Sequence, residues 1–410
     1  MPGTFIGIGF EYIFISFYTE NLPVVTILQN GWYFMENTLK FNNGKFTIMS
    51  LGDLHENIVI ENRDDRKRLE DMHNLVDMGI KAFKPDLIVL MGDTCCQKDE
   101  SEGFAVYKEG LKRALKPVIE SGIPFCWVFG NHEHDAGQED LIKEAYSEIE
   151  TCLSFNDEKS VDDLSYNLLV KDSDGKEDIL NLWFIDSNNC AEDRSISHYD
   201  WVHEDQIKWY EDKAQKIKEA HGGKTIPALL FQHIPVYEEY ELLREATLLE
   251  LPVSIEGIGA HKGKHYVLKD GVDGYLGEPP CSPDVNGGQF ESWKKTGDVK
   301  AAFFGHDHTN DFSGEVDGIL LSQNKTSGFR AYTDGCRCGV RITTVYENEP
   351  EKVHTKMYHF KELGLECHCL GPIMKHITDR QSMNMHKAGY AAAAVAGIAG
   401  AVKIIKTIKK

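Results

Sequence analysis

The chain has 410 residues, 41% of them hydrophobic, so it can bury a large core as one α/β domain or as two smaller domains. Its 44 basic and 65 acidic residues give a formal net charge of -21. A surface this acidic repels DNA, RNA and anionic membranes, so nucleic acid is not an expected partner. Small substrates that are held by bound metal remain compatible with this charge.

The first 40 residues form an N-terminal extension without recognisable chemistry. Residues 3–18 are apolar, but they lack a basic flank and carry Glu11 in the middle, which is atypical of a signal peptide. We therefore expect a cytoplasmic protein whose ten cysteines are reduced. The pairs Cys336/Cys338 and Cys367/Cys369 are candidates for a structural zinc site, although their spacing differs from C-x-x-C, and partly buried thiols are the simpler interpretation.

From residue 46 the chain repeats a pattern of strand, loop and helix. Apolar periodicity predicts helices over residues 64–83 and 104–118, and Lys84-Pro85 ends the first. Short apolar runs predict strands over residues 46–51, 87–91, 124–129, 179–185, 225–232 and 301–304. Buried strands joined by helices indicate a layered α/β domain, which we place at residues 41–362, with functional side chains on loops at the C-terminal ends of its strands.

Two further segments differ from this pattern. Residues 257–290 are interrupted by glycines and predict a long loop, on which His261 and His265 are expected to be solvated. Residues 363–410 form a C-terminal tail. Its uncharged stretch, Ala388 to Val402, is shorter than the roughly 20 apolar residues of a spanning helix. The isoleucines and lysines that follow suggest an amphipathic helix with weak membrane-surface contact.

Residues of the metal-ligand types occur in five places, each after an apolar run. Carboxylate, amide oxygen and imidazole together suit two divalent cations that share one site. The segments are Asp53-Leu54-His55, Gly92-Asp93, Gly130-Asn131-His132-Glu133, His233 and Gly305-His306-Asp307-His308.

These motifs differ in specificity. Asp71-Met72-His73 repeats the D-x-H pattern inside a predicted helix, where we interpret it as a surface or spacing accident. Taken alone, Asp93 reads as a helix N-cap and His233 as a core histidine. The two four-residue motifs are more specific, because glycine permits the tight turn that directs several side chains to one place.

The ordered set of motifs resembles the calcineurin-like metallophosphoesterase superfamily over residues 46 to about 345. The chain looks most like the purple acid phosphatase homologues that lack the extra N-terminal domain. That similarity rests on residues 184–187, 232–235 and 305–311. Cys96 stands where purple enzymes have tyrosine, and His55 stands where they have glycine, so no tyrosinate-to-iron colour is expected. The resemblance implies two packed mixed β-sheets flanked by helices, a four-layer sandwich.

The resemblance also implies a site with two divalent ions, for which manganese, iron and zinc are all suitable. One ion would take Asp53, His55, Asp93 and His308, and the other would take Asp93, Asn131, His233 and His306, so that Asp93 bridges. The cations would lower the pKa of water and neutralise phosphate oxygens.

His132 is the implied catalytic residue. It would contact the scissile phosphate and protonate the leaving oxygen, oriented by Glu133 or Asp53. Asn131 and Arg330 are further candidates for substrate contact.

We therefore expect a phosphoesterase that hydrolyses phosphomonoesters of small molecules or of a phosphoprotein. Two alternatives stay open. One is a phosphodiesterase or nucleotide hydrolase, and the other is a scaffold or regulatory protein of the same fold with little turnover. All seven ligand positions are filled, which favours the enzyme.

Overall fold

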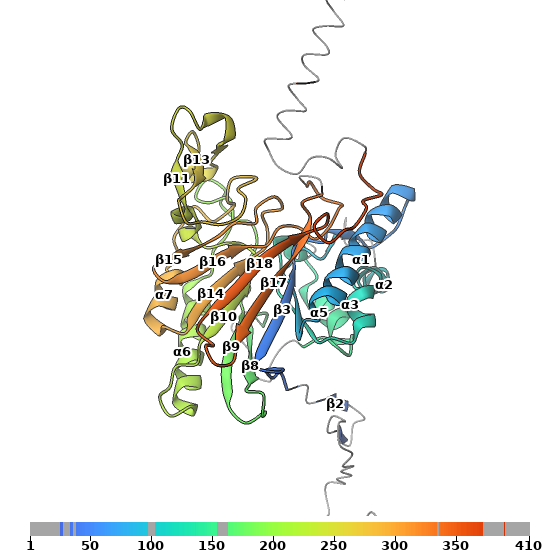
Figure 1. The fold of residues 1–410 in the computed structure, drawn as a ribbon, viewed down its shortest axis with the longest axis vertical. Helices are drawn as coiled ribbons and strands as arrows, with labels where there is room; N and C mark the ends of the chain where they lie inside the picture. Colours follow the sequence, from blue (N-terminus) through green and yellow to red (C-terminus); the bar gives the residue numbers. More distant parts are fainter. Residues whose placement is uncertain are drawn as a thin grey trace, which may run out of the picture.

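Two large β-sheets packed face to face form the centre of the molecule (Figure 1). The computed structural model describes residues 25–27, 33–35, 38–96, 103–135, 137–153, 163–333, 336–371 and 389. One sheet has six strands in the order β15-β16-β14-β10-β9-β8, and the other has five in the order β18-β17-β3-β5-β7. Both sheets contain parallel and antiparallel pairs, so both are mixed.

Helices lie between most of the large-sheet strands as far as β14, whereas β14 to β18 follow one another without a helix. The six-stranded sheet consists of β8 (Tyr166–Lys171), β9 (Asp178–Phe184), β10 (Ala228–Gln232), β14 (Val299–Phe304), β15 (Ser313–Val316) and β16 (Ile319–Gln323). The five-stranded sheet consists of β3 (Lys45–Leu51), β5 (Leu87–Leu90), β7 (Phe125–Trp127), β17 (Gly339–Tyr346) and β18 (Val353–His359). The smaller strands are β1 (Val25–Ile27), β2 (Tyr33–Met35), β4 (Glu56–Asn57), β6 (Cys95–Cys96), β11 (Leu243–Glu245), β12 (Ile255–Glu256) and β13 (His265–Leu268).

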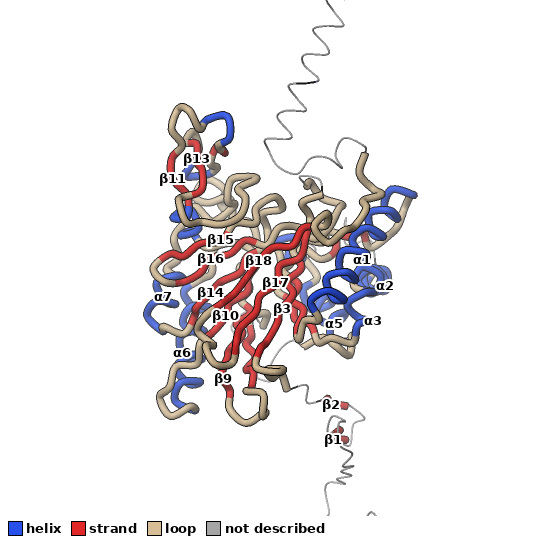
Figure 2. The backbone as a smooth tube through the Cα atoms, in the orientation of Figure 1, coloured by secondary structure: helices blue, strands red, loops and turns tan. Residues whose placement is uncertain are grey.

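Helices cover the outer faces of both large sheets, as Figure 2 shows. Beside the five-stranded sheet lie α1 (Arg63–Phe83), α2 (Phe104–Ala114), α3 (Lys116–Ser121) and α5 (Glu139–Ser147). Beside the six-stranded sheet lie α6 (Glu204–Ala220) and α7 (Gln289–Thr296). The remaining helical turns are α4 (Asn131–Asp135), η1 (Tyr237–Leu242), η2 (Leu251–Val253) and η3 (Gly259–His261).

Alternation along the strands divides the core into three layers of side chains. Ile48, Val89, Phe231 and others with the same orientation fill the space between the sheets. Their neighbours along the strands point the other way, and Met49 and Ile88 pack with α1. Since successive strand residues point to opposite faces, apolar runs of this kind are buried on both sides. The predicted four-layer sandwich is confirmed.

The six predicted strands are confirmed as β3, β5, β7, β9, β10 and β14, with ends shifted by a few residues. The helix predicted over residues 104–118 is wrong in one respect, because it divides at Leu115 into α2 and α3. Pro117 explains the division. Proline lacks a backbone N–H and is tolerated in the first turn of a helix but not in its interior.

The loop predicted over residues 257–290 contains regular structure. β13 pairs with β11 and β12 in a small antiparallel sheet. The His261 ring stacks on Tyr240 with centroids 3.6 Å apart, and His265 Nδ1 lies 3.2 Å from the Ser254 hydroxyl. Both histidines are half-buried, so their interpretation as solvated loop residues is wrong.

The packed structure extends beyond both expected ends of the domain. Leu39 is buried before residue 41, and Leu363, Leu365 and Leu370 pack against the α1 core after residue 362. Most of the N-terminal extension and the predicted tail helix lie outside the described residues. Among the residues that the structure describes, no helix is long and apolar enough to cross a membrane.

Candidate metal centre

All seven predicted ligands lie just beyond the C-terminal ends of strands. Asp53 and His55 follow β3, Asp93 follows β5, and Asn131 follows β7. His233 follows β10, and His306 and His308 follow β14. β3, β5 and β7 are parallel, as are β10 and β14, so within each sheet these loops leave from the same edge. This is where open α/β sheets bind ligands.

The backbone at the site is held in a strained conformation. Asp53, His55, Asp93 and His306 have φ values of 39°, 47°, 49° and 72°. Non-glycine residues rarely adopt this left-handed region, which costs on the order of 1 kcal/mol per residue or more. Four such residues in one cluster indicate that the surrounding fold imposes the conformation, as is common at functional sites.

Two motif glycines permit close contacts in the cluster. A Cβ atom on Gly130 would lie 2.1 Å from Asp93 Oδ1, and one on Gly92 would lie 2.5 Å from His233 Nδ1. Gly92 also has a φ of 91°. A side chain at either position would displace a predicted ligand, which explains why each motif begins with glycine.

The first group of ligand atoms belongs to Asp53, His55 and His308. His55 Nε2 lies 3.0 Å from His308 Nε2, and His308 Nε2 lies 3.7 Å from Asp53 Oδ1. His55 Nε2 is also 3.4 Å from Asp93 Oδ2. These groups are buried, with at most 7% of any of their side chains exposed.

The second group surrounds His233 Nε2. This nitrogen lies 3.3 Å from Asp93 Oδ2, 3.1 Å from Asn131 Oδ1 and 3.3 Å from His306 Nδ1. Asp93 Oδ2 is therefore close to both groups. The structure brings all seven predicted ligands together, in two groups that share Asp93.

The arrangement fits a pair of divalent cations. His233 Nδ1 lies 2.7 Å from the carbonyl of Met91, and His308 Nδ1 lies 3.1 Å from that of Tyr332. Donation to these carbonyls directs each Nε2 into the cluster, as backbone carbonyls do for histidines that ligate metal. His306 Nε2 is buried without a hydrogen-bond partner. Neighbouring N and O ligands at about 2.1 Å from one cation lie about 3 Å apart, close to the separations seen here.

The protonation states of His55, His308 and Asp93 suit metal binding. Burial alone would lower the pKa of His233, but Asp93 and Asp53 raise it to about 10, so a cation would displace the Nε2 proton on binding. Burial lowers the pKa of His55 to about 4 and that of His308 to about 3, so both imidazoles are neutral at neutral pH. Burial alone would raise the pKa of Asp93, but the charge of His233 and its hydrogen bond lower it well below its usual value. The shared carboxylate is therefore ionised and can contact two cations.

His132 lies at the edge of this cluster, with its side chain 49% exposed. Its ring centroid is 5.2 Å from that of His55, and its backbone N–H donates to Asp93 Oδ1 at 3.0 Å. Its Nδ1 contacts Asp135 Oδ2 at 3.0 Å, so Asp135, and neither Glu133 nor Asp53, is the carboxylate paired with its ring. From the sequence, Asp135 was interpreted as a solvated loop residue, although its position three residues after His132 in a helix could have indicated this contact.

Glu133 joins two ligand loops. Its carboxylate accepts hydrogen bonds from the backbone N–H groups of Asp93, Thr94 and Gly130 at 2.7–2.8 Å. The side chain is buried, so these three donors replace the water that would otherwise solvate the carboxylate. Glu133 therefore fixes the Asp93 loop relative to the Asn131 loop.

Arg330, Asp307 and His134 lie around the cluster, and each contacts other protein side chains. Arg330 Nη1 pairs with Asp65 Oδ1 at 2.6 Å, so a phosphate contact by Arg330 would require this ion pair to open. Asp307 is buried, and its carboxylate is directed to Asn310 and Gln323. His134 Nε2 pairs with Asp186 Oδ1 at 2.9 Å.

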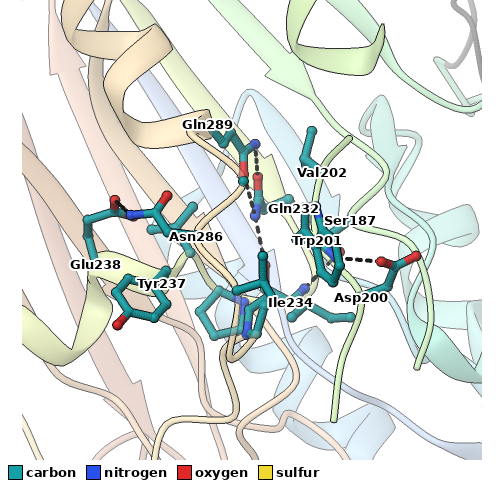
Figure 3. Close-up of a pocket in the computed structure, with 15 residues that line it drawn as sticks. Ser187, Asp200, Trp201, Val202, Gln232, Ile234, Tyr237, Glu238, Asn286 and Gln289 are labelled. Carbon is teal, nitrogen blue, oxygen red and sulfur yellow. Dashed lines mark hydrogen bonds between the residues drawn. The ribbon is translucent and has the colours of Figure 1, made fainter. Parts of the chain in front are cut away.

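A small pocket adjoins the His233 loop (Figure 3). Gln232, Ile234 and Tyr237 line it from the chain around His233, and Asn286 and Gln289 line it from the start of α7. Gln289 Nε2 donates to Gln232 Oε1 at 2.7 Å. Sequence reasoning missed Asn286 and Gln289, because they lie about 50 residues after His233 and match no motif.

This chain is similar to known proteins over most of its length. The chain is 28% identical to "Probable inactive purple acid phosphatase 14" of Arabidopsis thaliana over 73% of this chain and 75% of that protein. It is 26% identical to "Phosphatase DCR2" of Saccharomyces cerevisiae over 66% of this chain and 45% of that protein.

A solved structure of a dimetal phosphatase from Danio rerio aligns with a TM-score of 0.46 and 12% identity, covering 76% of this chain and 99% of that one. The calcineurin-like phosphoesterase model matches residues 46–310, which is more than half of the chain. This range contains all seven converging ligands. The chain belongs to the calcineurin-like phosphoesterase family.

Proposed function

We propose that the protein is a phosphatase that hydrolyses phosphomonoesters with two divalent cations. The observation that carries the proposal is the convergence of two ligand groups on Asp93, with imidazole nitrogens 3.0–3.3 Å from other ligand atoms. Without cations this arrangement would bury several polar groups in poor contact with one another. Membership of a phosphoesterase family supports the same reaction class.

The cations would be held by Asp53, His55, Asp93 and His308 on one side and by Asp93, Asn131, His233 and His306 on the other. Bound there, they supply an activated water and neutralise the charge of the phosphate oxygens. The chain itself positions these ligands. Glu133 and the Met91 and Tyr332 carbonyls hold the ligand loops and rings in place, so little reorganisation is needed when substrate binds.

His132 is suited to proton transfer. Its side chain is half-exposed at the rim, next to His55, so it can reach a phosphate that enters from solvent. Asp135 accepts a hydrogen bond from Nδ1, which leaves Nε2 to donate a proton to the leaving oxygen. The amide oxygen of Asn131 lies among the ligands, and its Nδ2 N–H groups would donate to the phosphate.

The pocket in Figure 3 adjoins the His233 loop and has room for little more than a water molecule, so it would contact only the edge of a substrate bound at the cations. Its lining mixes apolar Trp201 and Ile234 with the carboxylates of Asp200 and Glu238. This mixture favours a polar leaving group, such as a small alcohol or a phosphoprotein side chain, over an extended polyanion, because like charges repel.

The test compares wild type with Asp93→Asn, and uses Asp64→Asn, an exposed position at the start of α1, as a matched control. Metal content and hydrolysis of a phosphomonoester and a phosphodiester are measured together. We expect two cations per chain, a preference for the monoester, and a loss of at least about 100-fold in kcat/KM for Asp93→Asn alone.

Two outcomes would contradict the proposal. A preference for the diester would favour a phosphodiesterase or nucleotide hydrolase. Stoichiometric metal without turnover of either ester would favour a scaffold of the same fold, an alternative that the name of the Arabidopsis relative also suggests.

A further inference from the structure

A separate group of metal-ligand side chains lies where the segment after β18 crosses α1. Cys367 Sγ is 3.2 Å from Asp71 Oδ2 and 3.7 Å from Cys369 Sγ. The Cys336 side chain is hydrogen-bonded to Cys367. These residues come from three segments, and Asp71 and Cys367 are 296 positions apart. Neither the proposed reaction nor the family match, which ends at residue 310, accounts for this cluster.

The cluster takes one thiol from the first C-x-C pair and both from the second. Cys338 is turned away, with its Sγ 3.1 Å from the Gly328 carbonyl and 3.0 Å from the Thr333 hydroxyl. Asp71 supplies an oxygen from α1 and is fully buried. The ligand atoms of Asp71, Cys367 and Cys369 all lie within 4.8 Å of one another, and Cys336 contacts Cys367 from outside this group, so its sulfur would move inward to complete the four ligands of a structural zinc site.

The distances agree with tetrahedral coordination. Thiolates bound to Zn²⁺ at about 2.3 Å lie about 3.8 Å from each other in a tetrahedron. The observed separation of the Cys367 and Cys369 sulfurs is 3.7 Å. A zinc-bound carboxylate oxygen at about 2.0 Å lies about 3.5 Å from such a sulfur, near the 3.2 Å seen between Asp71 and Cys367.

Surrounding contacts prepare these groups to bind a cation. Asp71 Oδ2 accepts the backbone N–H groups of His368 and Cys369 at 2.8 Å each, and Oδ1 lies 3.0 Å from His368 Nδ1. Such contacts orient ligating carboxylates in metal sites.

We propose that Cys336, Cys367 and Cys369 bind a structural zinc ion as thiolates, with the carboxylate of Asp71 as the fourth ligand. Thiolate-rich sets select zinc over the harder divalent cations. Binding would release the thiol protons and hold α1, the loop before β17 and the segment after β18 together.

The proposed zinc ion would also support the dinuclear centre. Cys336 follows the loop in which Thr326 Oγ1 donates to the Asp53 carbonyl at 2.7 Å and the Tyr332 carbonyl faces His308 Nδ1. Fixing the end of this loop would limit the motion of two ligands of the first cation. Loss of the zinc should therefore loosen that cation without removing any of its ligands.

Cobalt substitution tests the proposal directly. Thiolate ligands give Co²⁺ a charge-transfer absorption band in the near ultraviolet, and the dinuclear centre contains only nitrogen and oxygen ligands. We expect full-length wild type to show this band with one thiolate-bound cobalt per chain. Cys367→Ser should lose the band and one equivalent of zinc, whereas Cys338→Ser, from the turned-away position of the same motif type, should keep both.

Thiol alkylation tests the same proposal in the wild-type protein. In zinc-loaded wild type, alkylation of Cys336, Cys367 and Cys369, followed by peptide mass mapping, should be at least about tenfold slower than after zinc is removed by a chelator. Cys338 should change little. The proposal is overturned if wild type lacks the cobalt band, if zinc does not slow alkylation of the three thiols, or if mapping finds them joined in a disulfide. These readouts do not depend on phosphatase activity.

Discussion

Two tripeptides of the same pattern have opposite structural outcomes. Asp53-Leu54-His55 follows β3 with φ values of 39° and 47° at its two polar residues, and both side chains enter the ligand cluster around Asp93. Asp71-Met72-His73 lies within α1, where residues two apart point about 200° away from each other. Asp71 accordingly faces Cys367, whereas His73 Nε2 lies 2.9 Å from the Arg113 carbonyl.

The comparison shows that backbone conformation decides whether a D-x-H pattern converges on one site. It also corrects our interpretation of the second tripeptide as a surface or spacing accident. Asp71 is 0% exposed, because the segment at residues 367–369 folds over it from the other end of the chain. The periodicity of the residues around Asp71 does not reveal that a segment almost 300 residues later packs over it.

The largest expected difference is between Asp53→Asn and Asp71→Asn. The first removes a carboxylate from the dinuclear centre, so kcat/KM should fall by at least about 100-fold. The second should lower the midpoint of thermal unfolding but keep kcat/KM within about threefold in the folded protein when the cations of the dinuclear centre are supplied in excess. Steady-state assays below both unfolding transitions, paired with thermal scans, measure this. Equal losses of activity in the two variants would show that Asp53 and Asp71 do not differ in their importance for activity.

A smaller effect comes from a single methyl group in each region. In Gly130→Ala the new Cβ would approach Asp93 Oδ1 to 2.1 Å, whereas Cβ at Gly371, after the thiol cluster, would meet nothing within 4 Å. Because a displacement of about 1 Å can cost about 100-fold in rate, Gly130→Ala should reduce kcat/KM by about 10–100-fold. Gly371→Ala should behave as wild type. Unchanged activity and metal content in Gly130→Ala would show that the Asp93 loop is not rigid.

The smallest expected effect concerns a proton at the rim of the dinuclear centre. Burial alone would lower the pKa of His134, but its hydrogen bond and ion pair with Asp186 raise it to about 9. A raised folded-state pKa stabilises the fold below the unfolded value of about 6.5, and this stability is lost as the pH rises through about 9. The metal-free protein should therefore lose on the order of 2 kcal/mol from this group over that range.

Urea unfolding of metal-free wild type and His134→Gln at about pH 6 and about pH 9 measures this contribution. The free energy of unfolding should fall more steeply with pH in wild type than in the variant. Parallel pH profiles would mean that the His134–Asp186 contact does not contribute to stability. The experiment separates hydrogen bonding at the rim from metal ligation, because neither residue is among the seven ligands.

The sequence by itself determined the central strands and the metal-ligand residues at their ends, whereas the four-layer architecture was implied only by the family resemblance. Apolar runs such as Leu87–Leu90 are buried on both faces, and the loop at the end of each run is therefore recognisable. A resemblance to a known family then assigned the order of the ligands. These features are local in the chain, so local patterns record them.

Only the tertiary structure decided which partners these residues meet. The pairing of His132 with Asp135, the three donors around Glu133 and the position of Arg330 against Asp65 follow from how loops pack. The thiol cluster on Asp71 is the strongest example, since it joins residues almost 300 positions apart. The physical reason is that hydrogen bonds and ion pairs depend on distances within a few ångströms, and sequence spacing does not report distances between segments.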